Sequence, residues 1–254
     1  KIDSIEPAVL DIKPDIIINA AAYTAVDKAE EEHDLAMTVN GVAPGVLAKA
    51  AKKTGASLIH YSTDYVFDGR SETPYREEDT TCPLNIYGES KLAGEKSIAE
   101  AGIPYLILRT SWVYSLQGKS ILRTIQKLAA EKDTLRIVDD QIGAPTWARS
   151  IALATRKIIE QCLRNRAKPS LSGVFHLTCQ GQSSWHDFAK EILDLSGASQ
   201  DTQLLPIPTS DYPTPAVRPL YSLLSNDKLK KVFAFEMPHW NDALIDCMHS
   251  KRKN

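Results

Sequence analysis

The chain has 254 residues, of which 43% are hydrophobic and 24% are charged, and its formal net charge is -2. This length allows one large domain, or a large domain with a smaller one. The small net charge and the lack of a long basic run argue against a nucleic-acid or anionic-membrane surface. Apolar runs are far shorter than the roughly 18 residues of a membrane span, and the first residues do not resemble a secretory signal. We therefore expect a cytoplasmic protein with no nucleic-acid or membrane partner.

The cysteines and histidines show no pattern typical of a metal site. The four cysteines are scattered without a C-x-x-C spacing, and the six histidines form no H-x-x-x-H or H-E-x-x-H pattern. Zinc sites in proteins usually show such spacings. We therefore expect free thiols and no bound metal.

In the first part of the chain, predicted helices alternate with apolar strands. The strands are expected at 15–22, 57–62, 105–114 and 135–140. The helices are expected at 4–12, 34–53, 87–102 and 119–131. Apolar strands that alternate with helices indicate a parallel sheet covered by helices on both faces, the doubly wound α/β class.

The pattern changes near residue 141. The remaining segments are predicted helices and one short strand, separated by a proline-rich stretch at 206–219. They do not alternate regularly, which indicates a smaller subdomain. We therefore predict a Rossmann-like domain over 1–140 and a mainly C-terminal substrate-binding subdomain over 141–254.

Polar residues follow three of the predicted strands at their carboxyl ends. These segments are "NAAAYT" (19–24), "YSTDYVFDG" (61–69) and "RTSWVY" (109–114). In open doubly wound sheets, ligands bind in the crevice beyond the carboxyl ends of the strands. The three segments therefore predict a single ligand site.

Tyr87 and Lys91 are four positions apart at the start of a predicted helix. Residues at this spacing lie on one helix face, with Cβ atoms roughly 5–6 Å apart. A nearby ammonium can lower the pKa of a phenol and make it a useful proton donor. A hydroxyl at the adjacent strand end, Ser62 or Thr63, could bind the same substrate oxygen. This spacing is common by chance, and its place after the "STD" strand end supports a catalytic role.

Five ordered motifs resemble a known enzyme family. They are "NAAAYTAVDKAE", "YSTDYVFDG", "YGESKLAGE", "RTSWVY" and "DQIGAPT". Together they are similar to the extended short-chain dehydrogenase/reductases, and within that family to the dTDP-4-dehydrorhamnose reductases. The similarity continues through "SSWHDFAKEI" and "PTSDYPTPAVRPLYS" and so covers essentially the whole chain.

The resemblance implies a reaction, a cofactor and a set of roles. The reaction is reduction, by NADPH or NADH, of the C4 keto group of dTDP-4-dehydro-6-deoxy-L-mannose to dTDP-L-rhamnose. The implied catalytic residues are Thr63, Tyr87 and Lys91, with Tyr87 as proton donor. The implied cofactor-binding residues are Ala22, Tyr23, Thr24, Tyr87 and Lys91. The implied substrate-binding residues are Thr63, Asp64, Tyr65, Val26 and Trp112. A dTDP-sugar is the expected partner, and a homodimer is compatible with the family.

Several of these residues also have a purely structural interpretation. Trp112 on an apolar strand could belong to the core, and Asp64 could cap the following turn. Asn40 could support the site or hold its own helix. The "DQIGAPT" segment could shape the substrate entrance or simply connect a strand to a helix. The other tryptophans are predicted to be packing residues: Trp147, Trp185 and Trp240.

The sequence departs from the family at two places. The Gly-rich phosphate-binding loop expected after the first strand is absent, and so is the residue that binds the adenine ribose. We therefore expect the N-terminal phosphate-binding β-α-β part to be missing, and the 15–22 strand to form a sheet edge. The segment 118–124 lacks the Asn-Phe pair usual in the family.

Two alternative functions remain open at this stage. One is a non-catalytic regulatory subunit resembling the beta subunit of methionine adenosyltransferase, which "SDYVFDG"-like stretches also suggest. The other is a different nucleotide-sugar epimerase or dehydratase, which is disfavoured because "STDYVF" lacks the Asp-Glu pair that a dehydratase carries beside the threonine.

Overall fold

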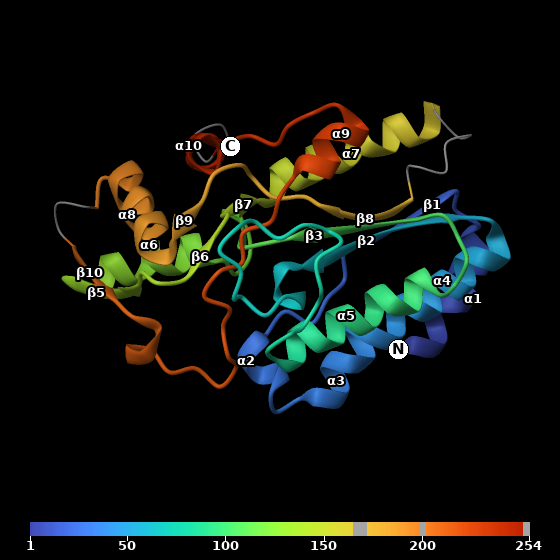
Figure 1. Ribbon diagram of the computed structural model, residues 1–254, viewed down its shortest axis with the longest axis horizontal. Helices are drawn as coiled ribbons and strands as arrows, with labels where there is room; N and C mark the ends of the chain where they lie inside the picture. The colour runs from blue at the N-terminus through green and yellow to red at the C-terminus, as the bar shows by residue number, and fades with distance from the viewer. Residues whose placement is uncertain (165–171, 199–201, 251–254) are drawn as a thin grey trace.

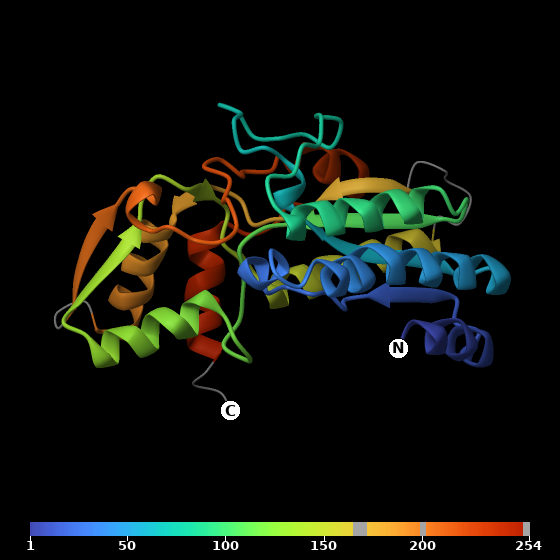
Figure 2. The same cartoon turned by 90° about the horizontal axis from the view of Figure 1, so that it is seen from below.

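The structure is a computed structural model that describes residues 1–164, 172–198 and 202–250. Figure 1 shows an elongated molecule, with a parallel sheet and its helices at one end and a smaller group of helices and short strands at the other. Figure 2 shows the same two bodies from below, joined by several crossings of the chain. We call them the sheet body and the second body.

The sheet body is built on four parallel strands. Their order is β1-β2-β3-β8, and their bounds are β1 Ile16–Asn19, β2 Ser57–Thr63, β3 Tyr105–Thr110 and β8 Gly173–His176. This confirms the α/β class with a parallel sheet. β1 lies at the edge of this sheet, where the side chain of Ile18 is left 49% exposed.

Helices cover both faces of the sheet, as Figure 1 shows. Leu58 and Ile107 pack with α4 (Ala43–Thr54) and α5 (Ile86–Ala99). The neighbouring Ile59 and Leu108 pack on the other face with α7 (Ala148–Arg164) and α9 (Asp227–Phe233). Successive strand residues point to opposite faces, so a continuous apolar run fills both cores.

The remaining elements of the N-terminal region lie on the α4 and α5 side. They are η1 (Ile2–Ser4), α1 (Ile5–Ile12), α2 (Val26–Ala29), α3 (His33–Met37) and the 3-10 turn η3 (Asp64–Val66). The predicted helix 34–53 is divided into α3 and α4 by a π-helical stretch, η2 (Thr38–Val42). Such π-helical insertions occur often at functional sites, and here the insertion contains Asn40.

The second body has its own apolar core. Its helices are α6 (Ile121–Glu131), α8 (Trp185–Ser196) and α10 (Trp240–Ser250). A parallel strand pair consists of β5 (Thr134–Val138) and β10 (Gln203–Ile207), which the turn η5 (Thr209–Asp211) follows. Two shorter pairs are β4 (Val113–Tyr114) with β7 (Thr146–Trp147), and β6 (Ile142–Gly143) with β9 (Ser183–Ser184). Within the described ranges, no helix has the length and apolar character to cross a bilayer.

The strand predicted at 135–140 is present, but the structure differs from the predicted pattern in two details. The predicted fourth strand, 135–140, forms β5 and pairs with β10 in the second body, whereas β8 is the fourth strand of the main sheet. The predicted strand 105–114 is interrupted at Trp112, whose φ is +47°. Strand patterns do not specify pairing partners, so the sequence alone did not show which strands pair in the main sheet.

A buried ion pair fixes α5 to the sheet. Arg109 of β3 donates from Nε to Glu95 Oε1 at 2.9 Å and from Nη2 to Oε2 at 2.7 Å, and both side chains are 5% exposed. The guanidinium also lies 5.1 Å from the centre of the Phe67 ring. A paired carboxylate and guanidinium tolerate burial, whereas either one alone does not. The pair therefore holds α5 and β3 together.

We predict that Glu95→Gln lowers the free energy of unfolding by about 3–5 kcal/mol, because it leaves the buried Arg109 without its counter-charge. Urea denaturation at neutral pH would measure this loss. The matched control is Glu160→Gln, which removes the exposed pair with Arg156 and should cost less than about 1 kcal/mol. Equal losses in the two variants would contradict the prediction.

Candidate active site

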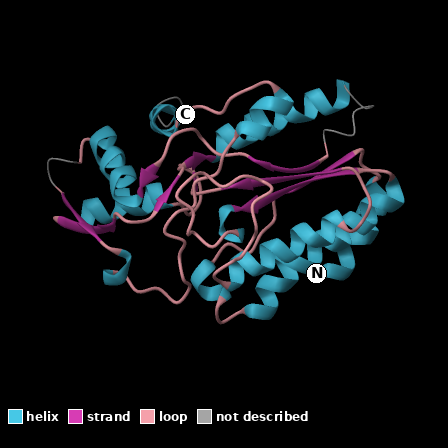
Figure 3. Cartoon of the chain, in the orientation of Figure 1, coloured by secondary structure: helices cyan, strands magenta, loops and turns pink. Residues whose placement is uncertain are grey.

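The loops that follow the strands gather where the sheet body meets the second body, as Figure 3 shows. Thr63 is the last residue of β2 and the N-cap of η3. Its Oγ1 donates to Asp64 Oδ1 at 3.0 Å and accepts from the backbone N of Tyr65 at 3.2 Å. These bonds stabilise the turn and fix the hydroxyl of Thr63 at the carboxyl end of the strand.

Tyr87 lies in the first turn of α5, beside η3. Asn85 caps this helix by accepting from the backbone N of Gly88 at 2.9 Å, and Glu30 accepts from the backbone N of Ile86 at 2.9 Å. A Cβ on Gly88 would lie 2.2 Å from the carbonyl oxygen of Tyr65. Only glycine therefore allows α5 to approach η3 this closely.

The surroundings of Tyr87 raise the pKa of its phenol. Burial is the largest cause, the negative charge of Asp64 adds to it, and a side-chain hydrogen bond with Thr63 acts in the opposite direction. The Tyr65 ring meets the Tyr87 ring edge-on, with centroids 5.5 Å apart. The expected lowering of this pKa is therefore not found, because burial is the largest cause and raises it.

Lys91 is buried beneath this turn, with 2% of its surface exposed. Its Nζ donates to the carbonyl oxygen of Tyr61 at 2.5 Å and lies 3.4 Å from Nε2 of His60. Burial lowers the pKa of Lys91 to about 8, and the charge of Glu95 opposes this decrease. The amine therefore changes its charge near the physiological range.

Asp64 is a buried carboxyl group next to Thr63 and Tyr87. Burial raises its pKa to about 6, although the nearby Ser222 side chain and the hydrogen bond from Thr63 oppose the rise. The structure therefore makes Asp64 more than a turn cap, because its charge also acts on Tyr87.

The loop after β1 is tied to α5 by Asn40. The Asn40 side chain accepts from the backbone N of Tyr23 at 2.8 Å and donates to its carbonyl oxygen at 2.9 Å. It also donates to Ser90 Oγ of α5 at 3.1 Å. Asn40 therefore holds in place the loop that carries Ala22 and Thr24, rather than only its own helix.

The phenol of Tyr23 points away from Asn40 and toward Glu32. A short hydrogen bond joins the two side chains, and Glu32 is the main cause that raises the pKa of Tyr23 to about 12. Tyr23 therefore lies in the predicted loop, and its described side-chain hydrogen bond is with Glu32, between α2 and α3.

Arg218 is a site residue that the sequence analysis did not single out. Its Nη2 donates to Asp27 Oδ2 at 2.8 Å and its Nη1 donates to the hydroxyl of Tyr65 at 3.2 Å. Val26, the first residue of α2, is the neighbour of Asp27. Arg218 thus connects α2, η3 and the proline-rich segment. The stretch "PAVRP" was the available signal, but nothing in it indicates these partners.

Trp112 follows β3 and stacks on Trp185 of the second body. The ring centroids are 3.5 Å apart and the planes differ by 4°. A Cβ on Gly143 would lie 2.5 Å from the Trp112 ring, and Trp185 Nε1 donates to Gln141 Oε1 at 3.1 Å. Trp185 packs on Trp112 and against the core of the second body, and the "DQIGAPT" segment contacts both rings.

The structure brings four predicted residues into direct contact: Thr63, Asp64, Tyr65 and Tyr87. Lys91 is connected to this group by its hydrogen bond to the carbonyl oxygen of Tyr61, two residues before Thr63. Val26 is connected through its neighbour Asp27, which pairs with Arg218. Within the described ranges, no hydrogen bond or ring contact joins Trp112 to Tyr87. Trp112 instead lies just after β3, the strand next to β2, where it stacks on Trp185.

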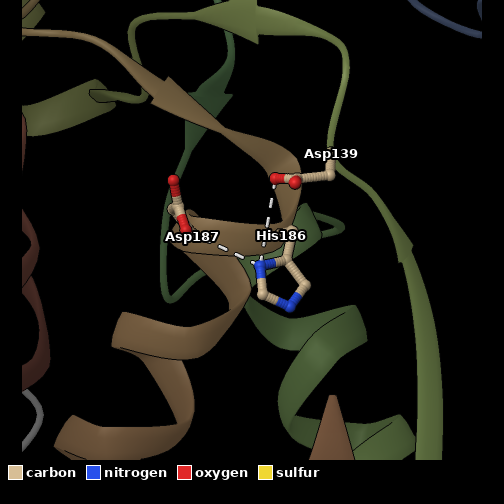
Figure 4. Close-up of side chains that lie close together, drawn as sticks. All are labelled: Asp139, His186 and Asp187. Carbon is tan, nitrogen blue, oxygen red and sulfur yellow. Dashed lines mark ion pairs between the residues drawn. The ribbon is translucent and has the colours of Figure 1, made fainter. Parts of the chain in front are cut away.

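Three side chains near Trp185 have the spacing of potential metal ligands (Figure 4). His186 Nδ1 lies 3.9 Å from Asp139 Oδ1 and 3.6 Å from Asp187 Oδ1. Asp139 Oδ1 already accepts from Ser184 Oγ at 2.7 Å, and the group lies at the N-terminus of α8, where the helix dipole disfavours a cation. His186 Nδ1 therefore lies between two carboxylates, one of which is held by Ser184.

Comparison with known proteins gives consistent matches. The family model described as RmlD substrate binding domain matches residues 1–253. A dTDP-4-dehydrorhamnose reductase of Burkholderia thailandensis is 51% identical over 245 residues, which cover 94% of this chain and 82% of that protein.

Solved structures agree with these matches. A dTDP-4-dehydrorhamnose reductase of Clostridium acetobutylicum has a TM-score of 0.92 and 36% identity, over 99% of this chain and 86% of that one. The enzyme of the same name from Bacillus anthracis, in complex with NADP, has a TM-score of 0.91 and 36% identity, over 98% and 85% of the two chains.

We predict that Asp64→Asn changes how stability depends on pH. The folded pKa of Asp64, about 6, lies above the unfolded value of about 3.9. The folded state therefore binds more protons in this window, and the contribution of Asp64 to stability is lost as the pH rises from about 4 to about 6. Urea midpoints from pH 4 to 7 should show a smaller loss in Asp64→Asn than in wild type.

The exposed Asp3 provides the control for this experiment, since Asp3→Asn should leave the profile unchanged. A wild-type loss that persists in full in Asp64→Asn would show that another group causes it.

We predict that Trp185→Phe abolishes the exciton coupling of two stacked indoles in the far-ultraviolet circular dichroism spectrum. Trp147→Phe is the control, because the Trp147 ring contacts Arg149 rather than another indole, and the couplet should remain. An exciton signal that is unchanged in Trp185→Phe would be inconsistent with the stacking of Trp112 on Trp185.

Proposed function

Because this chain belongs to the RmlD substrate binding domain family, we propose that it reduces the C4 keto group of dTDP-4-dehydro-6-deoxy-L-mannose to give dTDP-L-rhamnose. In this proposal NADPH or NADH is the reductant and Tyr87 is the proton donor. The proposal rests on the names of its relatives, on the NADP complex of a structural neighbour and on the arrangement of Thr63, Tyr87 and Lys91.

The observation that carries the proposal is the position of Tyr87. Its ring lies against that of Tyr65, two residues after Thr63 at the carboxyl end of β2, and the nearby Thr63 side chain acts to lower the pKa of the phenol. Lys91 lies one helical turn further along α5 and is held by Tyr61. A phenol and a hydroxyl that converge at a strand end can bind one carbonyl oxygen between them.

The donor groups of Lys91 fit a dinucleotide cofactor. An ammonium carries three N–H donors, and the carbonyl oxygen of Tyr61 accepts one of them. A remaining donor could bind a ribose hydroxyl. Asn40 fixes the loop of Ala22, Tyr23 and Thr24 beside the same helix, where that loop could line the cofactor. When bound, the cofactor would supply the hydride to C4.

The residues of the chain would supply the proton and the orientation. Thr63 would turn its hydroxyl proton from Asp64 to the carbonyl oxygen and so orient it, and Tyr87 would protonate that oxygen as negative charge develops on it. A tyrosine phenol is already protonated at neutral pH, and burial raises its pKa further, which suits a proton donor. Its raised pKa does not prevent the transfer, because an alkoxide is a much stronger base than a phenolate.

The sugar nucleotide would be bound by residues around this centre. We assign this role to Asp64, Tyr65, Val26 and Trp112. Tyr65 contacts Tyr87 directly and is held by Arg218. The stacked rings of Trp112 and Trp185 would offer an apolar wall beyond the end of β3.

We predict that Tyr87→Phe lowers kcat by about 10²–10⁴-fold, the usual contribution of a positioned general acid. The measurement is oxidation of NADPH in the presence of the dTDP-keto sugar. Substrate affinity should change little, because the aromatic ring remains. Retention of most of the rate would rule out Tyr87 as the proton donor.

Lys91→Met tests the second role separately. We expect weaker cofactor binding together with slower turnover, measured as the dissociation constant of NADPH by fluorescence titration. The control is Lys96→Met, on the same helix, where the residue is exposed. If the wild-type protein oxidises no cofactor with this substrate but binds another enzyme tightly, the regulatory-subunit function would replace the reductase.

A further inference from the structure

His60 is a buried histidine that the proposed chemistry does not use. It lies in β2 with no exposed surface, between Asn19 at the end of β1 and Lys91 of α5. Its Nδ1 is 2.9 Å from Asn19 Nδ2, and its Nε2 is 3.4 Å from Lys91 Nζ. Three elements of the sheet body therefore meet at one imidazole ring.

The orientation of the Asn19 amide is determined by the backbone. The N–H of Ala21 donates to Asn19 Oδ1 at 3.2 Å. If the amide were reversed, its NH₂ group would face the Ala21 N–H, and two donors would meet. The Nδ2 group therefore faces His60, and because an amide nitrogen only donates, the Nδ1 of His60 must accept.

This bond selects one tautomer of His60. Burial and the charge of Lys91 lower the pKa of His60 well below its usual value, so the ring is neutral. With Nδ1 accepting, the proton is on Nε2 and points toward Lys91 Nζ. A neutral amine can accept this N–H, whereas an ammonium has no lone pair and is repelled by it.

We propose that Asn19 and His60 are positioning residues that hold the imidazole with its Nε2 proton toward Lys91, and thereby set the pH at which Lys91 loses its charge. Lys91 would grip the cofactor as an ammonium, so this pH would limit activity on the alkaline side. The kinetic part of this inference rests on the proposed function, and the structural part does not.

The other groups that face Lys91 also affect the balance between its charged and neutral forms. On its own helix, Glu95 favours the charged form, but two bonds to Arg109 of β3 occupy this carboxylate. From β2, the Tyr61 carbonyl accepts a hydrogen bond from Nζ. Tyr87, one turn before Lys91, remains a neutral phenol, and Asn19 of β1 carries no charge. His60 is therefore the neighbour whose choice of tautomer can shift Lys91 between its charged and neutral forms.

The first test is the tautomer itself, read by ¹⁵N NMR of the histidine side chains in the protein with and without NADPH. His60→Gln identifies the signal of His60 among the six histidines. We expect a protonated Nε2 and an unprotonated Nδ1 in wild type. In Asn19→Leu and Asn19→Asp, where Nδ1 no longer receives a hydrogen bond, we expect the proton to move to Nδ1. A wild-type ring protonated at Nδ1 would overturn the proposal.

The second test is the alkaline limb of the pH profile of kcat/KM. In both variants Nε2 becomes an acceptor for the ammonium, and the limb should move upward by about one pH unit, a tenfold change in the ionisation constant. Asn19→Leu adds no charge and so controls for the new carboxylate of Asn19→Asp. A shift in Asn19→Asp alone would assign the effect to charge and overturn the proposal.

The two tests separate this inference from the proposed function. If the protein does not reduce the dTDP-keto sugar, the proposed function fails while the NMR result still decides the tautomer. If reduction proceeds and the limb does not move in either variant, the role of Asn19 and His60 fails and the reductase function stands.

Discussion

The buried pair of Glu95 and Arg109 is the constraint on which the rest of the structure depends. Glu95 follows Tyr87 and Lys91 on the same face of α5 at intervals of four residues, so the helix turns a polar face toward the sheet. Such a face is stable in a core only if each group finds a partner. Arg109 neutralises Glu95, and the position of α5 against β2 and β3 then places Tyr87 and Lys91.

Burial has a consistent electrostatic effect on the ionisable groups of this face and of the strand and turn beside it. It raises the pKa of Tyr87 and Asp64 and lowers the pKa of Lys91 and His60. In every case the neutral form is favoured, because transfer of charge from water into a packed core costs free energy. A centre of this kind can hold a proton on a phenol at neutral pH and keep an amine close to its point of ionisation.

The tight approach of the elements gives the site its geometry. Gly88 allows α5 to contact the Tyr65 carbonyl, and Gly143 leaves room for the Trp112 ring. Asn40 joins a loop and a helix that are far apart in the chain. Each of these contacts depends on one residue type at one position, which explains why several short motifs, rather than one, accompany the site.

The sequence alone determined the class of fold and the placing of Tyr87 and Lys91 on one face of a helix. Apolar strands alternating with helices indicated the parallel sheet, and the spacing of Tyr87 and Lys91 placed both on one helix face, because these are local properties of the chain. Tertiary structure alone decided that β8 replaces β5 in the sheet, that Arg218 holds Tyr65, and that Trp185 stacks on Trp112. It also reversed the expected shift of the Tyr87 pKa, because desolvation depends on packing between distant segments.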